Sequence, residues 1–153
     1  MATEHHFEGS LAWAGQPESQ AFDAQHWNRT TRLSFGNGAS IEASSPPVFG
    51  GDGALPNPET LMIASLMQCH FLTFMALAVR KGLRVTAYDD RATGRLGMKD
   101  GKMRFVEVVL RPRVVMADAA HAAALADMHH KAHQHCFMSN SVNFDVRVEA
   151  GAS

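Results

Sequence analysis

PNPETLMIASLMQCHFLTFMALAVRKG, residues 56–82, predicts the helix around which the rest of the chain is organised. Asn57 suits the N-cap, Pro58 the first helical position and Gly82 the C-terminal stop. Between them, residues 61–79 are apolar or small on almost every side of the expected helix. Other elements or lipid must enclose such a helix. Cys69 lies in its middle, so the chemistry of a thiol in a buried helix has to be explained.

A membrane span is the first alternative for this stretch. The nineteen residues from Leu61 to Val79 would just cross a bilayer. Gln68, Cys69 and His70 would then lie at the midplane of a lone span, which offers them no partners. We therefore favour a buried helix and expect no membrane partner.

Length and composition predict one globular domain over residues 1–153. Hydrophobic residues make up 46% of the chain, charged residues 19%, and the net charge is −1. These values are ordinary for a globular protein and give no electrostatic reason to expect a nucleic-acid partner. The first residues show no basic segment followed by an apolar run, and two cysteines do not make a secreted disulfide framework. We expect a cytoplasmic protein.

The order of predicted elements indicates an α+β fold. Strands are expected at 7–13, 29–35 and 39–43, before the central helix, and at 84–98 and 103–116 after it; a second helix at 118–135 and a strand at 142–148 follow. Gly36-Asn37-Gly38 and Asp100-Gly101 are turn signals typical of hairpins. Hairpins separated by only two helices predict an antiparallel sheet of about six strands with two main helices.

The sequence offers no local group that would ionise Cys69. A thiol reacts as its thiolate, and burial raises its pKa unless a positive partner is near. Cys69 lies too far along the helix for the dipole to help, and the side chain of His70 points about 100° away. An arginine from elsewhere is the obvious candidate. Without one, Cys69 is a small core residue, which the pattern alone allows because free cysteines are commonly buried.

Cys136 is the second thiol, and it ends the second predicted helix. Leu125, Met128, Ala132 and Cys136 recur at helical spacing and should share one face. If this face packs against the central helix, the two thiols could meet.

Together these contexts resemble a known family. Four stretches carry the resemblance: NPE (57–59), Cys69-His70 ten residues after the glutamate, LTFMALA (72–78) and AHQHCFMSNSV (132–142). With them, the chain resembles the OsmC/Ohr family of organic-hydroperoxide-reducing proteins over roughly residues 7–148. The resemblance implies an intertwined homodimer with two active sites at the interface. It also implies a peroxidatic cysteine at Cys69 and a resolving cysteine at Cys136.

The resemblance further assigns an acidic residue to Glu59 and an activating arginine to Arg29, with Arg32 as the fallback. On one straight helix Glu59 and Cys69 are about 15 Å apart along the axis, too far for both to hold one guanidinium. We therefore predict that Arg29 and Glu59 of one subunit complete the site around Cys69 of the other. The expected reductant is an external dithiol of lipoyl type, and no cofactor or metal is implied. The chain departs from the best-known hydroperoxide-resistance members at Phe137-Met138, where those have Pro-Tyr.

Two other interpretations remain. His129, His133 and Cys136 have a spacing that can place three metal ligands on one helix face, although no second cluster completes a tetrahedral set. Alternatively, the chain is a non-catalytic dimer of OsmC-like fold whose two cysteines are structural.

Overall fold

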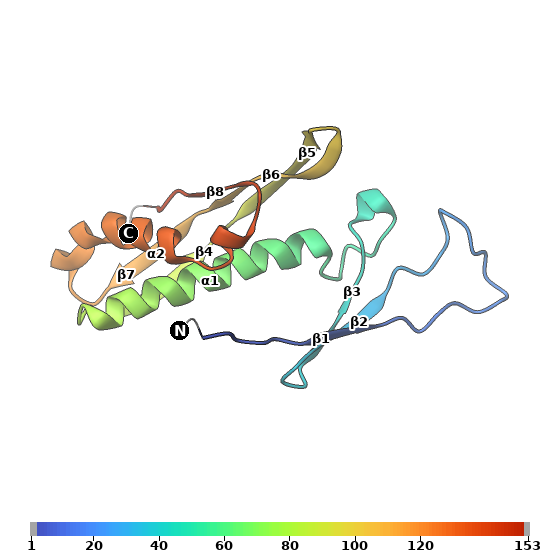
Figure 1. Ribbon diagram of the computed structural model, residues 1–153, viewed down its shortest axis with the longest axis horizontal. Helices are drawn as coiled ribbons and strands as arrows, with labels where there is room; N and C mark the ends of the chain where they lie inside the picture. The colour runs from blue at the N-terminus through green and yellow to red at the C-terminus, as the bar shows by residue number, and fades with distance from the viewer. Residues whose placement is uncertain (1–2, 152–153) are drawn as a thin grey trace. The chain divides into compact units, whose positions relative to one another are not determined.

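A computed structural model describes residues 3–151 of the chain (Figure 1). The chain divides into two compact units, Met1–Leu61 and Met62–Ser153. The expectation of a single domain over residues 1–153 stays a prediction.

The first unit is built on a three-stranded antiparallel sheet in the order β1-β2-β3, with β1 at Gly9–Ala12, β2 at Thr31–Phe35 and β3 at Ser40–Ala43. The turn between β2 and β3 is the expected hairpin: Phe35 N–H donates to the Ala39 carbonyl at 2.8 Å, and Gly38 has a φ of 87°. A short 3-10 helix, Pro47–Phe49, follows in the loop that leads to α1.

The central helix α1 spans Pro58–Arg80, and its ends are capped as the sequence predicts. Asn57 Oδ1 accepts from the Thr60 N–H at 2.9 Å, and Thr60 Oγ1 accepts from the Asn57 N–H at 3.0 Å, so two free donors at the start are satisfied. At the other end Gly82 has a φ of 67°, and the Leu83 N–H donates to the Ala78 carbonyl at 2.9 Å. This is the glycine-dependent stop of an α-helix.

Only one stripe of α1 is buried within the chain. The stripe consists of Leu66, His70, Phe74 and Ala78, spaced four residues apart. The prediction that α1 is enclosed is thus met along one side only. By length and composition α1 could also cross a membrane, and 22% of its most apolar window is buried. The remaining apolar surface of the helix is therefore available to another partner.

The second unit places two sheets beside α1 and α2. Its elements are β4 (Val85–Asp90), β5 (Thr93–Lys99), β6 (Lys102–Leu110), β7 (Pro112–Met116), α2 (Leu125–His135) and β8 (Asp145–Val148), with 3-10 turns at Ala119–Ala124 and Ser139–Ser141. β4 pairs with β7 and β5 with β6, both antiparallel, whereas β8 runs parallel to β6. In Figure 1, α2 lies next to the C-terminal half of α1.

The α+β class with two main helices is confirmed, but the strands differ from the prediction. Within residues 3–151 there are eight strands in three sheets, and one pairing is parallel. The predicted strand 103–116 is interrupted at Arg111, because the Arg111 N–H turns to Asp90 Oδ1 at 2.7 Å and Pro112 has no N–H to donate. The second helix begins later than the sequence predicts. Asp118 Oδ1 accepts from the Ala120 N–H at 2.9 Å and caps a 3-10 turn, and α2 starts only at Leu125.

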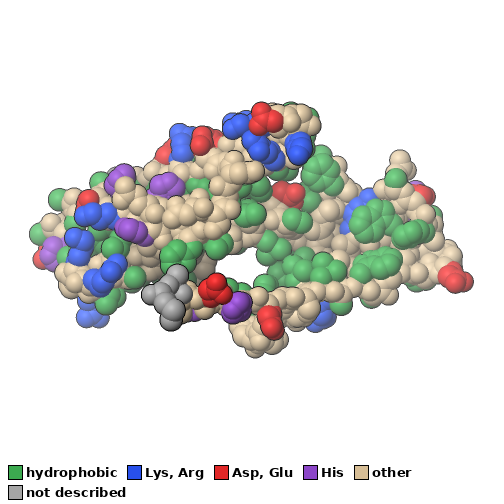
Figure 2. All heavy atoms as spheres, viewed as in Figure 1, with side chains coloured by type: hydrophobic (Ala, Val, Ile, Leu, Met, Phe, Trp, Pro, Cys, Tyr) green, Lys and Arg blue, Asp and Glu red, His purple; other side chains and the backbone are tan. Residues whose placement is uncertain are grey.

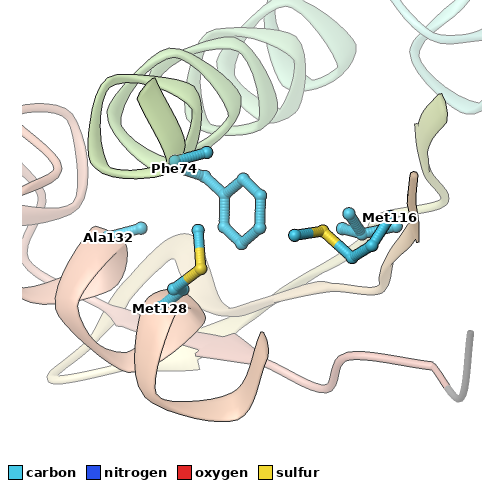
Figure 3. Close-up of a cluster of buried hydrophobic side chains, with 6 residues drawn as sticks. Phe74, Met116, Met128 and Ala132 are labelled. Atoms are coloured by element: carbon cyan, nitrogen blue, oxygen red, sulfur yellow. The ribbon is translucent and has the colours of Figure 1, made fainter. Parts of the chain in front are cut away.

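The core that fixes α2 against α1 is centred on Phe74 (Figure 3). Phe74 packs between Met128 and Ala132 of α2 and Met116 of β7, and Ala78 and Val114 complete the cluster. One face of the second helix therefore packs against the central helix, which is the condition under which the two thiols could meet. A second cluster joins Leu66 of α1 to the strands, through Val108, Leu110 and Val146.

The exposed surface carries charges of both signs. Figure 2 shows Lys or Arg side chains interspersed with Asp or Glu on the face that it presents. Several of these charges pair across strands: Arg147 contacts Glu107 at 3.0 Å, and Arg111 contacts Glu149 at 3.4 Å. Exposed pairs of this kind contribute little stability, but they keep either sign from predominating locally.

A histidine pair is buried between α1 and α2. His70 Nε2 and His129 Nδ1 are 3.0 Å apart, so one nitrogen donates and the other accepts, which requires the accepting ring to be neutral. The His129 ring also stacks on Phe74, with ring centroids 4.5 Å apart. Burial lowers the pKa of His129 from 6.5 to about 4, and burial together with the neighbouring His129 and His133 lowers that of His70 from 6.5 to about 4. The pair therefore favours the folded state only while it is uncharged.

This pair predicts an acid-sensitive fold. Between pH 6.5 and about 4 the unfolded chain binds protons that the folded chain does not, so the free energy of unfolding should fall as the pH falls. The expected slope is up to about 1.4 kcal/mol per pH unit for each histidine. Urea unfolding at fixed protein concentration from pH 5 to 7.5 measures it. His129→Asn should flatten the slope and His130→Asn, at an exposed neighbour, should not; equal slopes in both variants would contradict the assignment.

Candidate functional site

Cys69 opens onto a pocket on the side of α1 that the chain leaves uncovered. Its side chain is half-buried, and the next residue along the helix, His70, is buried. The pocket has a volume of about 760 Å³ and is lined by residues of α1 and of the segment after α2: Ser65, Gln68, Cys69, Leu72, Thr73, Ala76, Arg80, His135, Phe137 and Met138. Helix geometry thus turns His70 into the core and Cys69 toward the pocket, as the 100° rotation between neighbours requires.

The second thiol lies beside the first. Cys136 is fully buried immediately after α2, where its thiol lies close enough to Cys69 for the two to influence each other. Burial raises the pKa of Cys136, and the Cys69 thiol raises it further, whereas contacts with Ser139 oppose the shift. The Ser139 N–H donates to Cys136 Sγ at 3.4 Å. Cys136 is accordingly a protonated thiol at neutral pH, held in place next to Cys69.

The apolar walls of the pocket include one of the large apolar side chains near the two cysteines. Among Met62, Phe71, Phe74 and Phe137, only Phe137 lines the pocket. Phe74 is core, and Phe71 packs edge-on against Tyr88 with ring centroids 4.9 Å apart. Leu72 and Met138 supply the remaining apolar walls. Leu72 reaches the pocket because it lies one helical turn after Cys69, and Met138 because the chain turns after Cys136. The amino-acid composition alone reveals neither placement.

Arg29 lies in the first unit, in the loop before β2. Its guanidinium donates to three carbonyls of that loop, Ala24 at 2.7 Å, Trp27 at 3.0 Å and Gln25 at 3.5 Å, and it stacks over the Trp27 ring at 4.6 Å. Gly50, with a φ of 82°, lets the guanidinium approach closely, because a Cβ there would lie 3.0 Å from Arg29 Cζ. Backbone carbonyls hold this cation, so it can be redirected toward an anion without breaking an ion pair.

The predicted Arg29–Glu59 pair is not among the ion pairs formed within residues 3–151. Glu59 Oε2 is buried and, among the described residues, has no hydrogen-bond partner. Arg32 is engaged on the sheet instead, with Glu42 at 3.8 Å and Ser40 Oγ at 3.4 Å. The roles of Arg29 and Glu59 stay predictions, and a buried carboxylate oxygen without a partner is a place where a guanidinium would be stabilising.

The three residues considered as metal ligands are not gathered at one point. His129 turns to His70, and Cys136 turns to Ser139 and Cys69. In the described part of the chain, no three His, Cys, Asp or Glu side chains lie close enough together to hold a metal ion. Helical spacing placed these residues on one side of α2, but their packing partners separate them.

Comparison with known proteins identifies relatives of this fold. A family model described as OsmC-like protein matches residues 50–150, about two thirds of the sequence. The chain belongs to the OsmC-like protein family. Among curated proteins, no relative matches the sequence.

Three solved structures illustrate the similarity. An OsmC-like protein of unknown function from Vibrio cholerae has 33% identity and a TM-score of 0.90, covering 97% of this chain and 100% of its own. An organic hydroperoxide resistance protein from Elizabethkingia anophelis, with thiocyanate bound, has 20% identity and a TM-score of 0.71, covering 98% and 96%. A putative organic hydroperoxide resistance protein from Vibrio cholerae, with captopril in one of its active sites, has 22% identity and a TM-score of 0.69, covering 98% and 92%.

Sequence reasoning overlooked two residues of this OsmC-like site. Ser139 donates to Cys136, and its position three residues after the cysteine in a turn was a usable signal. Arg80, in the last turn of α1, lines the pocket of Cys69. The interval of eleven residues between Cys69 and Arg80 is close to three full helical turns and could have identified it.

Proposed function

We propose that this OsmC-like protein is a thiol-dependent peroxidase that reduces organic hydroperoxides to alcohols. The observation that carries the proposal is the pair of adjacent thiols, one opening onto an apolar pocket and the other buried behind it. Such a pair suits two-step oxidation, because one sulfur meets the substrate and the other waits as a protonated thiol. Structural relatives described as organic hydroperoxide resistance proteins support the substrate class.

The reaction begins at Cys69. Its thiolate attacks one oxygen of the hydroperoxide: an S–O bond forms, the O–O bond breaks, and the leaving alkoxide takes a proton to become the alcohol. The sulfur is thereby oxidised to a sulfenic acid. Cys136 condenses with this sulfenic acid, forming the disulfide and releasing water, which protects Cys69 from further oxidation. An external dithiol, proposed to be of lipoyl type, reduces the disulfide by thiol–disulfide exchange and becomes a disulfide itself.

A second subunit is part of the proposal. Apolar residues of α1 such as Leu72 and Val79 are 55% and 72% exposed in the single chain, more than a stable isolated core helix leaves open. We propose a homodimer in which Arg29 and Glu59 of one subunit complete the site around Cys69 of the other. Glu59 would orient the guanidinium, and the guanidinium would stabilise the thiolate and polarise the peroxide. The proposed compartment is the cytoplasm.

Substitution of the two thiols tests the reaction. Cys69→Ser should abolish reduction of cumene hydroperoxide, because the nucleophile is lost, while circular dichroism shows the fold retained. Cys136→Ser should allow one turnover and then accumulate sulfinic acid or a mixed disulfide, visible by mass spectrometry. The wild type should lose both thiols per chain on treatment with hydroperoxide and regain them with dithiol. If neither thiol reacts, the alternative of an OsmC-like protein with structural cysteines is correct.

The arginine assignment has a matched control in the same segment. Removing a cation that contacts a thiolate raises the thiol pKa by about 1–3 units. Arg29→Ala should therefore slow the reaction of Cys69 with hydroperoxide at pH 7 by roughly tenfold or more, and the pH profile of the rate from stopped-flow kinetics would show it. Arg32→Ala, which breaks only the contacts with Glu42 and Ser40, should leave this profile unchanged. A profile that moves with Arg32 and not with Arg29 would transfer the role.

The sharing of residues between subunits can be tested by complementation. Heterodimers of a Cys69→Ser chain and an Arg29→Ala chain contain one wild-type Cys69 and one wild-type Arg29, on different chains. If Arg29 acts across the interface, these two meet and one of the two sites is restored, although both parent homodimers are impaired. If Arg29 acts within its own chain, the purified heterodimer is as slow as the Arg29→Ala homodimer. Light scattering of the wild type establishes the dimer itself.

A further inference from the structure

The hydroxyl of Ser139 is a buried polar group without a structural task. Its Oγ is buried within the single chain and forms no hydrogen bond to any described residue. The hydroxyl of Ser141, two positions further on, is by contrast engaged, since it donates to the Phe137 carbonyl at 2.6 Å. A buried hydroxyl without a partner disfavours the folded state. The Ser139 hydroxyl therefore calls for a partner that is present in another chemical state of the protein.

A short turn holds Ser139 against the second thiol. The Asn140 N–H donates to the Cys136 carbonyl at 3.0 Å, and Asn140 Nδ2 donates to the Gln134 carbonyl at 3.1 Å, so the turn is fixed to the end of α2. The Ser139 N–H donates to Cys136 Sγ at 3.4 Å. Cys136 is fully buried and the Ser139 Oγ is buried too, so no second subunit is needed to exclude water from this contact.

The charge state of Cys136 decides whether the hydroxyl has an acceptor. Burial, the largest influence, raises the pKa of Cys136, whereas hydrogen bonding from the Ser139 side chain favours the ionised form and lowers this pKa. The sulfur of a protonated thiol is a weak acceptor, which agrees with the unbonded hydroxyl of the folded protein. A thiolate accepts charge-assisted hydrogen bonds that are roughly twice as strong as neutral ones. Ionisation of Cys136 thus supplies the partner that the Ser139 hydroxyl lacks.

We propose that Ser139 is a catalytic residue of the disulfide-forming step, in which its hydroxyl stabilises the thiolate of Cys136. This inference rests on the proposed function and deepens it. Cys136 loses its proton and its sulfur attacks the sulfenic sulfur of Cys69, so the S–S bond forms and the S–O bond breaks. The leaving hydroxide takes up one proton, which balances the proton lost by Cys136, and becomes water. Ser139 keeps its own proton and donates a hydrogen bond throughout.

Single-turnover kinetics test this role. One equivalent of cumene hydroperoxide is mixed with reduced protein, and samples quenched with dimedone are analysed by mass spectrometry for sulfenic acid and disulfide. In Ser139→Ala the formation of the sulfenic acid should be unchanged, and its conversion to disulfide should slow by about tenfold, the effect of losing one hydrogen bond to an ionised group. Ser139→Thr keeps a hydroxyl and should restore part of the rate. At excess hydroperoxide, Ser139→Ala should accumulate more sulfinic acid than the wild type.

Ser141→Ala is the matched control, because it removes a hydroxyl from the same turn that is already bonded to a carbonyl. It should lower the midpoint of urea unfolding and leave the rate of disulfide formation unchanged. Ser139→Ala should show the opposite pattern, with no loss of stability, since its hydroxyl has no partner to lose. A stability loss in Ser139→Ala without a slower second step, or an equal slowing in Ser141→Ala, would overturn the proposal.

A measurement without turnover separates this inference from the proposed function. In the Cys69→Ser background, Cys136 is the single thiol, and the NMR shift of its Cβ carbon between pH 7 and 11 follows its ionisation while circular dichroism monitors the fold. Adding Ser139→Ala should raise the pKa of Cys136, and adding Ser141→Ala should not. If this holds but the wild type reduces no hydroperoxide, the proposed function fails while the hydrogen bond to the thiolate stands. If hydroperoxide is reduced but neither this pKa nor the second step depends on Ser139, the role of Ser139 is refuted and the peroxidase stands.

Discussion

The one-sided burial of α1 is the constraint on which the rest of the structure depends. Leu66, His70, Phe74 and Ala78 recur every four residues and pack against α2 and the strands of the second unit. A stripe of this kind fixes the rotation of the helix about its axis, because any other rotation would pull Phe74 out of the core. Cys69 is therefore held at the border between the packed side and the open side, half-covered yet within reach of a ligand.

The same constraint leaves a large apolar surface outside the core. The open side of α1 includes Ala, Leu, Met and Val residues that a lone chain exposes to water, and Leu72 and Val79 are the clearest examples. Burying this side at about 25 cal/mol per Å² would strongly favour association. An apolar helix covered along one stripe is thus an incomplete structure, and the proposed second subunit supplies what the core lacks.

Much of the fold could be predicted from the sequence, because its signals are local. The caps of α1 at Asn57 and Gly82, the hairpin at Gly38 and the face of α2 that carries Met128 and Ala132 all follow from spacing and turn chemistry. The division of 103–116 at Arg111 could not, because it depends on a hydrogen bond to Asp90, more than twenty positions away. The parallel placement of β8 beside β6 depends on the whole tertiary arrangement in the same way.

The candidate site could also be predicted only in part. The two cysteines stand out by their positions on two helices, and the structure brings them together. The partners that position them are less visible: the Ser139 N–H is a backbone group, and the pocket walls come from exposed side chains after α2. Helical periodicity identifies buried faces well, whereas the open face of α1 gives no contrast between polar and apolar residues. Its functional residues can be identified only when the neighbouring segment is in view.

The pairing of β8 with β6 has a consequence for the rate of the proposed reaction between the two cysteines. Leu110 and Val148 lie opposite each other in this pairing, so the intervening segment that carries Cys136 is tethered at both ends to one strand. Such tethering reduces the chain entropy that a free thiol would lose in reaching its target. In the proposed reaction, Cys136 would therefore act at a high effective molarity, and its condensation with Cys69 would be an intramolecular step whose rate is independent of protein concentration.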